Sequence, residues 1–134
     1  MNEAARSAPC RMAFGDLSFL PRFAYGDQAE IAEVTGSGEG TVLGTGFARF
    51  AKASIPWTVQ YDEVLLVIEG KVTVRTAAGD IEAGPRDCIW LPKGTELHYE
   101  SEGALVFYAI HPSDWTSSDW ASSDWASSDR GEAS

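Results

Sequence analysis

The chain is poor in cysteine and has no long apolar run. Two cysteines, Cys10 and Cys88, among 134 residues are too few for a disulfide framework. Cys88 lies within an apolar run, so we expect it to be a buried thiol. No apolar segment approaches the length of a membrane span, and residues 1–12 lack the apolar core of a secretory signal. We therefore expect a cytoplasmic protein that does not enter a membrane.

Positive charge is also scarce. Ten Lys and Arg residues stand against twenty Asp and Glu residues, which gives a formal net charge of −10 at pH 7. Nucleic acids and anionic membranes are bound through cationic surfaces, so neither is expected as a partner. We take the acidic balance chiefly as a source of solubility.

What the chain does contain is a regular series of short apolar or alternating runs between residues 17 and 112. Glycine-bearing turns separate them at roughly ten-residue spacing, a pattern typical of an all-β sandwich or barrel. No segment keeps a 3.6-residue apolar period between two caps, so we predict little helix. The strands are expected within residues 41–50, 64–68, 71–75, 87–91, 97–99 and 104–110.

The ends of the chain differ from this central zone. Residues 1–15 lack periodicity and are predicted to form a flexible arm, residues 16–115 the barrel, and residues 116–134 a low-complexity disordered tail. The tail repeats Asp-Trp-x-Ser-Ser from residue 114 onward. Because the period is five, Trp115, Trp120 and Trp125 would not share one face of a helix, nor one face of a strand. The alternative to a disordered tail is that the repeat forms a short linear motif that docks to a partner. Trp115 could instead fold back onto the barrel.

Two motifs in the central zone resemble those of the cupin superfamily. Glu63 stands seven residues before the turn residue Gly70, as in the first cupin motif, and the segment 92–94 (Pro-Lys-Gly) resembles the end of the second. The resemblance implies a single cupin domain with the double-sheet jelly-roll fold. It also implies a homodimer formed through edge strands and an N-terminal segment. The aromatic residues of segment 14–25 offer apolar surface for this: Phe14, Phe19, Phe23 and Tyr25.

The metal ligands of that superfamily are replaced in this chain. The three positions that carry histidine in metal-binding cupins hold Trp57, Val59 and Leu97, so no metal and no cofactor is predicted. His98 stands one residue late, and a shift of one residue along a strand turns a side chain to the opposite face. His98 and His111 are therefore expected at the surface. An atypical metal site made by Glu63, Tyr61 and His98 remains an alternative.

Several separated segments are similar to the cupin domain of the ethanolamine-utilisation EutQ family. They are residues 44–47, 56–58, 61–63, 69–70, 89–94 and 108–115, and Pro-Trp-Thr followed by Tyr-Asp-Glu replaces the His-x-His stretch. The resemblance implies a role in ethanolamine utilisation and, only as a possibility, acetate kinase activity. No Walker-type glycine loop accompanies it.

Alternation along the strand that leads to Glu63 defines the candidate site. Trp57, Val59, Tyr61 and Glu63 share one side, which the cupin resemblance identifies as the barrel interior. A poorly solvated carboxylate has a raised pKa and suits general acid or base work. Glu63 and Tyr61 are therefore the catalytic candidates, while Asp62 should point away. Tyr61 and Glu63 could also form a structural network.

The candidate substrate-binding residues are aromatic: Trp57, Tyr99 and Trp90. The sequence pattern does not decide whether Trp90 lines the pocket or lies on the outer face. Together the residues predict an EutQ-like cupin that binds or transforms a small polar metabolite without a His-rich metal centre. Two alternatives stay open. The first is a non-enzymatic binding or scaffold module built on a dimeric platform, and the second is a metal-dependent cupin enzyme with atypical ligands.

Overall fold

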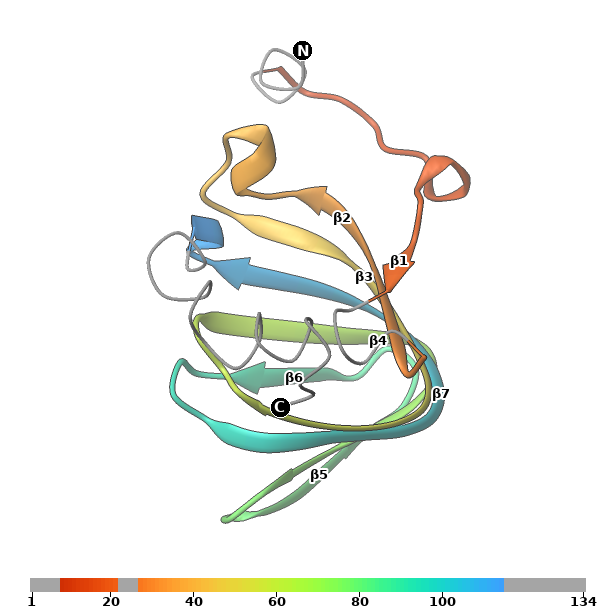
Figure 1. The fold of residues 1–134 in the computed structure, drawn as a ribbon, viewed down its shortest axis with the longest axis vertical. Coiled ribbons are helices and arrows are strands. Elements are labelled where there is room, and N and C mark those ends of the chain that lie inside the picture. The colour runs from red at the N-terminus through yellow and green to blue at the C-terminus, as the bar shows by residue number, and fades with distance from the viewer. Residues whose placement is uncertain (1–7, 22–26, 115–134) are drawn as a thin grey trace.

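The computed structural model describes residues 8–21 and 27–114, and strands dominate them (Figure 1). The predicted all-β class is confirmed. The described residues include the single-turn 3-10 helices η1 (Phe14–Asp16) and η3 (Ser37–Glu39). The strands are β1 (Leu20–Pro21), β2 (Ala29–Thr35), β3 (Gly44–Thr58), β4 (Asp62–Thr76), β5 (Gly79–Ala83), β6 (Cys88–Leu91) and β7 (Glu96–His111).

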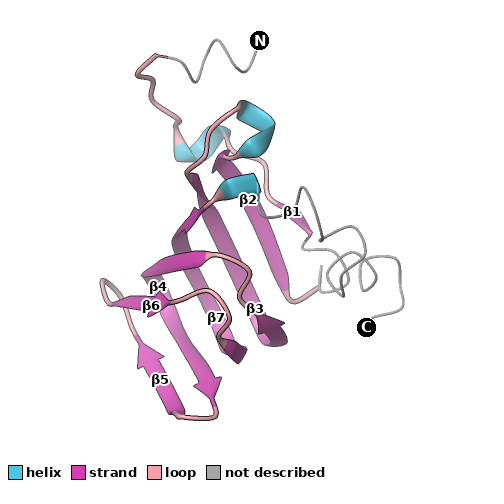
Figure 2. Cartoon of the chain, turned by 90° about the vertical axis from the view of Figure 1, so that its left-hand side faces the viewer, coloured by secondary structure: helices cyan, strands magenta, loops and turns pink. Residues whose placement is uncertain are grey.

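These strands form one antiparallel sheet with the order β1-β2-β3-β7-β4-β5, and β6 pairs with β4. The long strands β3, β4 and β7 bend, so that the sheet curls over its own inner face (Figure 1). Figure 2 shows β2, β3 and β7 side by side, with β5 and β6 against β4 and the helical turns gathered at one end.

The bends divide the curled sheet into two halves. In the first half, residues 62–67 of β4 pair with the end of β7 and residues 63–66 pair with β6. In the second half, residues 72–76 of β4 pair with β5 and residues 73–75 with the beginning of β7. Strand β3 runs through both halves, because residues 44–51 pair with residues 103–110 of β7 and residues 53–58 with residues 96–101.

Two breaks expected between separate strands are instead bends within single strands. Residues 69–70 lie inside β4, where the register with β7 shifts on both sides of Gly70. Gly70 has a φ of 81°, and a Cβ there would lie 2.1 Å from the carbonyl oxygen of Gly103. The predicted break at 102–103 lies likewise inside β7. A bulge bends a strand without ending its ladder, which is why these glycine-bearing segments do not separate two strands.

The core lies on the inner face, and buried residues alternate with more exposed ones along much of β3, β4 and β7, except at the bends. The largest side chains with less than 2% exposure are Ile55, Leu91, Val59, Val67, Val72, Val74 and Val106. Tyr61 and Tyr99 belong to the same cluster. The inner face of both halves is therefore one continuous apolar core.

Strand β6 corrects one expectation. Cys88 is exposed rather than buried, because β6 directs Ile89 and Leu91 to the core and Cys88 to the outside. The sequence 88–91 is apolar throughout, so the pattern alone does not show which face is buried.

Other expectations fall outside the described residues. The tail at 116–134 with Trp120 and Trp125 is among them, as are Trp115, Phe23, Tyr25 and residues 1–7 of the predicted N-terminal arm. In the part of the chain that is described, no helix has the length and apolar character needed to cross a membrane.

Candidate functional site

Glu63 lies on the inner face near the beginning of β4. It pairs with Leu91 of β6 and Ile110 of β7, and only 5% of its surface is exposed. Leu65 and Val67, which follow it at alternate positions, are also buried. Alternation predicted this placement. Glu63 is thus a carboxylate held within an apolar core.

Tyr99 is a hydrogen-bond partner of this carboxylate. Its hydroxyl donates to Oε1 of Glu63 over 3.2 Å, and both residues are buried. Tyr99 comes from the second half of the sheet, where it pairs with Ile55 and Val74, whereas Glu63 belongs to the first half. A buried carboxylate needs such a donor, because leaving its charge without compensation inside a protein is costly. The hydrogen bond joins the two halves across the core.

Two aromatic side chains extend the site along the same face. The ring centroids of Trp57 and Tyr61 are 6.4 Å apart with an interplanar angle of 41°. Tyr61 is buried, and Trp57 is partly buried and packs against the core. We define the Glu63 cluster as Glu63, Tyr99, Tyr61 and Trp57.

The turn at residues 92–95 is fixed to the chain segment that precedes Glu63. Gly94 N–H donates to the Val59 carbonyl, and Val59 N–H donates to the Thr95 carbonyl. The backbone N–H of Lys93 donates to Oδ1 of Asp62 over 3.0 Å. Asp62 is exposed, as expected for a residue that points away from Glu63. These contacts hold the beginning of β4 in place.

The positions that carry histidine in metal-binding cupins hold apolar side chains in this chain. Val59 and Leu97 are buried, and Leu97 pairs with Trp57 across β3 and β7. Within residues 8–21 and 27–114, no group of three or more His, Cys, Asp or Glu side chains could hold a metal ion. His98 is exposed on the face opposite Leu97 and Tyr99, so the structure does not bring it to Glu63.

Trp90 lies apart from the cluster. It is 58% exposed and pairs with Val64, which is itself 39% exposed on the outer face of β4. Its neighbours Ile89 and Leu91 occupy the inner face. The structure therefore places Trp90 on the outside of the sheet, opposite to the side that a substrate-binding role beside Glu63 requires.

Tyr108 is an inner-face aromatic residue that the sequence analysis did not select. It is partly buried, packs against the core and pairs with Leu65. A Cβ on Gly46 would lie 2.6 Å from the Tyr108 hydroxyl, so the ring extends over this glycine. The alternation of Ala104, Val106 and Tyr108 in β7 was the signal that could have identified it.

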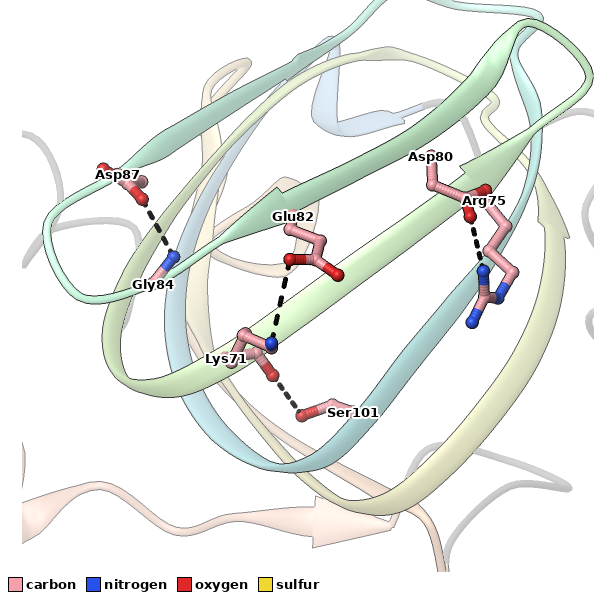
Figure 3. Close-up of polar contacts among 7 residues, drawn as sticks. All are labelled: Lys71, Arg75, Asp80, Glu82, Gly84, Asp87 and Ser101. Atoms are coloured by element: carbon pink, nitrogen blue, oxygen red, sulfur yellow. Dashed lines mark hydrogen bonds and ion pairs between the residues drawn. The ribbon is translucent and has the colours of Figure 1, made fainter.

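The basic side chains of the described residues lie outside the Glu63 cluster. Figure 3 shows Lys71 beside Glu82 and Arg75 beside Asp80 on the β4–β5 hairpin. Arg75 also donates to Glu100 over 2.7 Å, and this hydrogen bond raises the pKa of the guanidinium above its ordinary value. All seven Lys and Arg residues in the described part of the chain are exposed: Arg11, Arg49, Lys52, Lys71, Arg75, Arg86 and Lys93.

Comparison with known proteins identifies the family. The model of "Ethanolamine utilisation protein EutQ" matches residues 25–117, well over half of the chain. The chain belongs to the EutQ family. The curated protein "Acetate kinase EutQ" of Escherichia coli K12 is 33% identical over 85 residues, which cover 63% of this chain and 36% of that protein. The chain spans between 35% and 48% of the length of the curated EutQ relatives it matches.

Solved structures agree with this assignment. The crystal structure of a putative EutQ from Salmonella typhimurium LT2 is 26% identical, with a TM-score of 0.60 over 63% of this chain and 70% of that one. An RmlC-like cupin from Shewanella frigidimarina has a TM-score of 0.65 over 78% and 92% of the two chains, and at 12% identity it shows the fold alone. The EutQ family domain of this chain thus has the cupin fold, as its two motifs predicted.

Proposed function

We propose that this EutQ-family cupin binds or transforms a small polar metabolite at the Glu63 cluster. The observation that carries the proposal is the buried hydrogen bond from Tyr99 to Glu63. An ionisable group is costly to keep in an apolar core, and perturbed ionisable groups gather at functional sites. A carboxylate held by a hydroxyl from the opposite half of the sheet is oriented for proton transfer or for hydrogen bonding to a ligand.

Each member of the cluster has a proposed role. Glu63 is the general acid or base, and Tyr61, two residues before it on the same side, orients the substrate. Tyr99 positions the carboxylate, and the indole of Trp57 provides an apolar surface for the ligand. A panel of small metabolites, screened by thermal shift against the parent protein and Glu63→Gln, tests the proposal. Stabilisation of the parent that disappears in Glu63→Gln supports it, and the absence of any Glu63-dependent ligand contradicts it.

A non-enzymatic scaffold module is the second candidate. The observation that favours it is apolar surface on the outside of the molecule, with Leu20 64%, Trp90 58% and Phe14 44% exposed. In this case the protein acts as a cytoplasmic homodimeric platform, and the Glu63 cluster has only a structural role. A metabolite that binds in a Glu63-dependent manner would decide against it.

The activity named for the curated relatives requires its own test. "Acetate kinase" describes proteins of which this chain spans less than half, so phosphoryl transfer is here only a proposal from family resemblance. An assay with acetate and ATP on the purified chain addresses it directly. Formation of acetyl phosphate that is lost in Glu63→Gln would connect the activity to the cluster.

A further inference from the structure

We propose that a second copy of this chain packs on the outer face of the first half of the sheet. The surface is a patch of apolar side chains from three neighbouring strands, which we call the outer patch. Its members are Val64, Leu66 and Ile68 of β4, Cys88 and Trp90 of β6, and Phe107 of β7. The proposal does not depend on a ligand at the Glu63 cluster, which lies on the inner face.

The strand register brings the members of the outer patch side by side. Val64 pairs with Trp90, and Leu66 pairs with Cys88 on one side and with Phe107 on the other. The residues between them in β4 and β6 are buried in the core, so the patch side chains are directed outward. In an antiparallel sheet with one solvated face, the outward positions are commonly polar. Apolar residues at these outward positions therefore indicate a face that another surface covers.

The outer patch has the exposure and the size of an interface centre. Trp90 is 58%, Val64 39% and Ile68 37% exposed, and Cys88 is exposed as well. From the spacing of strands and of residues along them, three strands over residues 64–68 give an area of roughly 300–400 Å². Apolar patches of about this size are often functional. A standard interface takes roughly 800 Å² from each partner, with an apolar centre and a polar rim.

The N-terminal segment already covers the neighbouring part of the same face. The ring centroid of Phe14 lies 5.0 Å from that of Phe47 in β3, and Phe47 lies 5.2 Å from Phe107, both pairs edge to face. Phe47 and Phe107 are cross-strand partners on this face. The chain thus buries part of its outer face under a packed segment, while Trp90 and Val64 stay exposed beside it. A second copy on the outer patch would extend this cover.

Charge identifies a second copy as the occupant. None of the six patch residues is acidic or basic, and the exposed residues Asp62 and Glu69 stand at the two ends of the patch on β4. An uncharged apolar surface is complementary to itself, as a two-fold interface requires. A basic partner attracted by the net charge of −10 would desolvate its charges against apolar side chains. The Asp-Trp repeat of the tail would likewise bring a carboxylate with each Trp.

The same charge predicts how the association depends on salt. Each copy carries a net charge of −10, so long-range repulsion opposes a contact that apolar burial favours. Salt screens this repulsion. The dimer should therefore become tighter as the salt concentration rises, whereas a dimer held by ion pairs would become weaker.

Analytical ultracentrifugation of the full-length protein between micromolar and submillimolar concentration tests the proposal. We expect a dimer whose dissociation constant falls when sodium chloride is raised. Val64→Asp places a charge on the outer patch of both copies and should weaken the dimer at least about tenfold. Ile81→Asp is the matched control, because Ile81 is 41% exposed but lies on β5 in the second half of the sheet. It should leave the dissociation constant unchanged.

Three results of this experiment overturn the proposal. The first is a monomer throughout the concentration range, and the second is a dimer that Val64→Asp and Ile81→Asp weaken equally. The third is a dimer that Leu20→Asp dissociates and Val64→Asp does not, because that dimer forms at the edge strand β1.

Cross-linking through Cys88 gives an independent measurement on a protein with an intact patch. In Cys10→Ser, residue 88 carries the one remaining thiol, and face-to-face packing of sheets at about 10 Å brings it within reach of a short bismaleimide from its copy. We expect covalent dimers, and none when the single thiol is moved to β5 by Ile81→Cys with both natural cysteines replaced by Ser. Alkylation of Cys88 should slow as the protein concentration rises. Protection of Cys88 in a monomer would mean that the chain covers its own patch and would overturn the proposal.

Discussion

Asp62 and Glu63 are neighbours in β4 whose side chains lie on opposite faces of the sheet. Asp62 is exposed and accepts a hydrogen bond from the backbone of Lys93, whereas Glu63 is buried and accepts one from Tyr99. One carboxylate thus fixes a surface turn, and the other enters the core. Because alternate strand residues face opposite sides, the two cannot act as an acid–base pair.

Replacing Tyr99 with Phe should destabilise the protein by about 1.5–3 kcal/mol, the range for a hydrogen bond to a charged group. Urea unfolding followed by circular dichroism measures the change. A double-mutant cycle with Glu63→Leu, which removes the acceptor, isolates the pair, because its coupling energy reports the interaction between the two side chains. A coupling energy near zero would show that the contact contributes nothing to stability.

Glu63→Gln should unfold at the same temperature as the parent protein or a higher one, while metabolite binding is lost. The substitution removes a buried charge and keeps an amide oxygen that accepts the hydrogen bond of Tyr99. Thermal melting of both proteins across neutral pH provides the comparison. A clearly lower melting temperature would identify Glu63 as part of a structural network and would leave the scaffold hypothesis ahead.

Asp62→Ala should release the turn at residues 92–95 and cost about 1 kcal/mol. The substitution leaves the N–H of Lys93 without its side-chain acceptor, so amide exchange at this position should accelerate. Asp62→Asn keeps an acceptor oxygen and serves as the control. Unchanged exchange at Lys93 in the Ala variant would contradict the prediction.

Gly70→Ala should destabilise the fold far more than Gly79→Ala, although both glycines have a positive φ. A methyl group at residue 70 would lie 2.1 Å from the carbonyl oxygen of Gly103, whereas nothing lies within 4 Å at residue 79. The Gly79 variant carries only the backbone cost of a positive φ, roughly 1–3 kcal/mol, so a distinctly larger loss at residue 70 reports the overlap at the bend. Chemical denaturation quantifies both, and equal losses would mean that β4 can relax at this bend.

A homodimer is predicted at tens of micromolar protein, where association that buries apolar surface is readily populated. Phe14 and Leu20 are exposed at the N-terminal side, and β1, which contains Leu20, is the first strand of the sheet. Light scattering should give twice the mass of the chain, and Leu20→Asp should shift it toward the monomer. A monomer in the parent protein at this concentration would refute the prediction.

Local patterns were sufficient to predict the strand class and the direction of Glu63, Tyr61 and His98, because alternation is a property of neighbouring residues. They could not show that residues 69–70 and 102–103 are bends within strands. Glycine marks turns and bulges alike, and the difference depends on strands distant in sequence.

The same limit applied to the site. The pairing of Tyr99 with Glu63 joins residues from the two halves of the sheet, so no local spacing reveals it. For Trp90, both faces of β6 carry apolar residues, and only the packed structure shows that Ile89 and Leu91 are the buried pair.

The bent strands also determine how a ligand can reach the inner face. Because β3, β4 and β7 each run through both halves of the curled sheet, parting the halves would require three paired strands to straighten at their bends together. The sheet should therefore resist such opening. We expect a molecule bound at the Glu63 cluster to enter and leave through an end of the barrel, so its residence time should depend on the turns at that end, including the one that Asp62 fixes at residues 92–95.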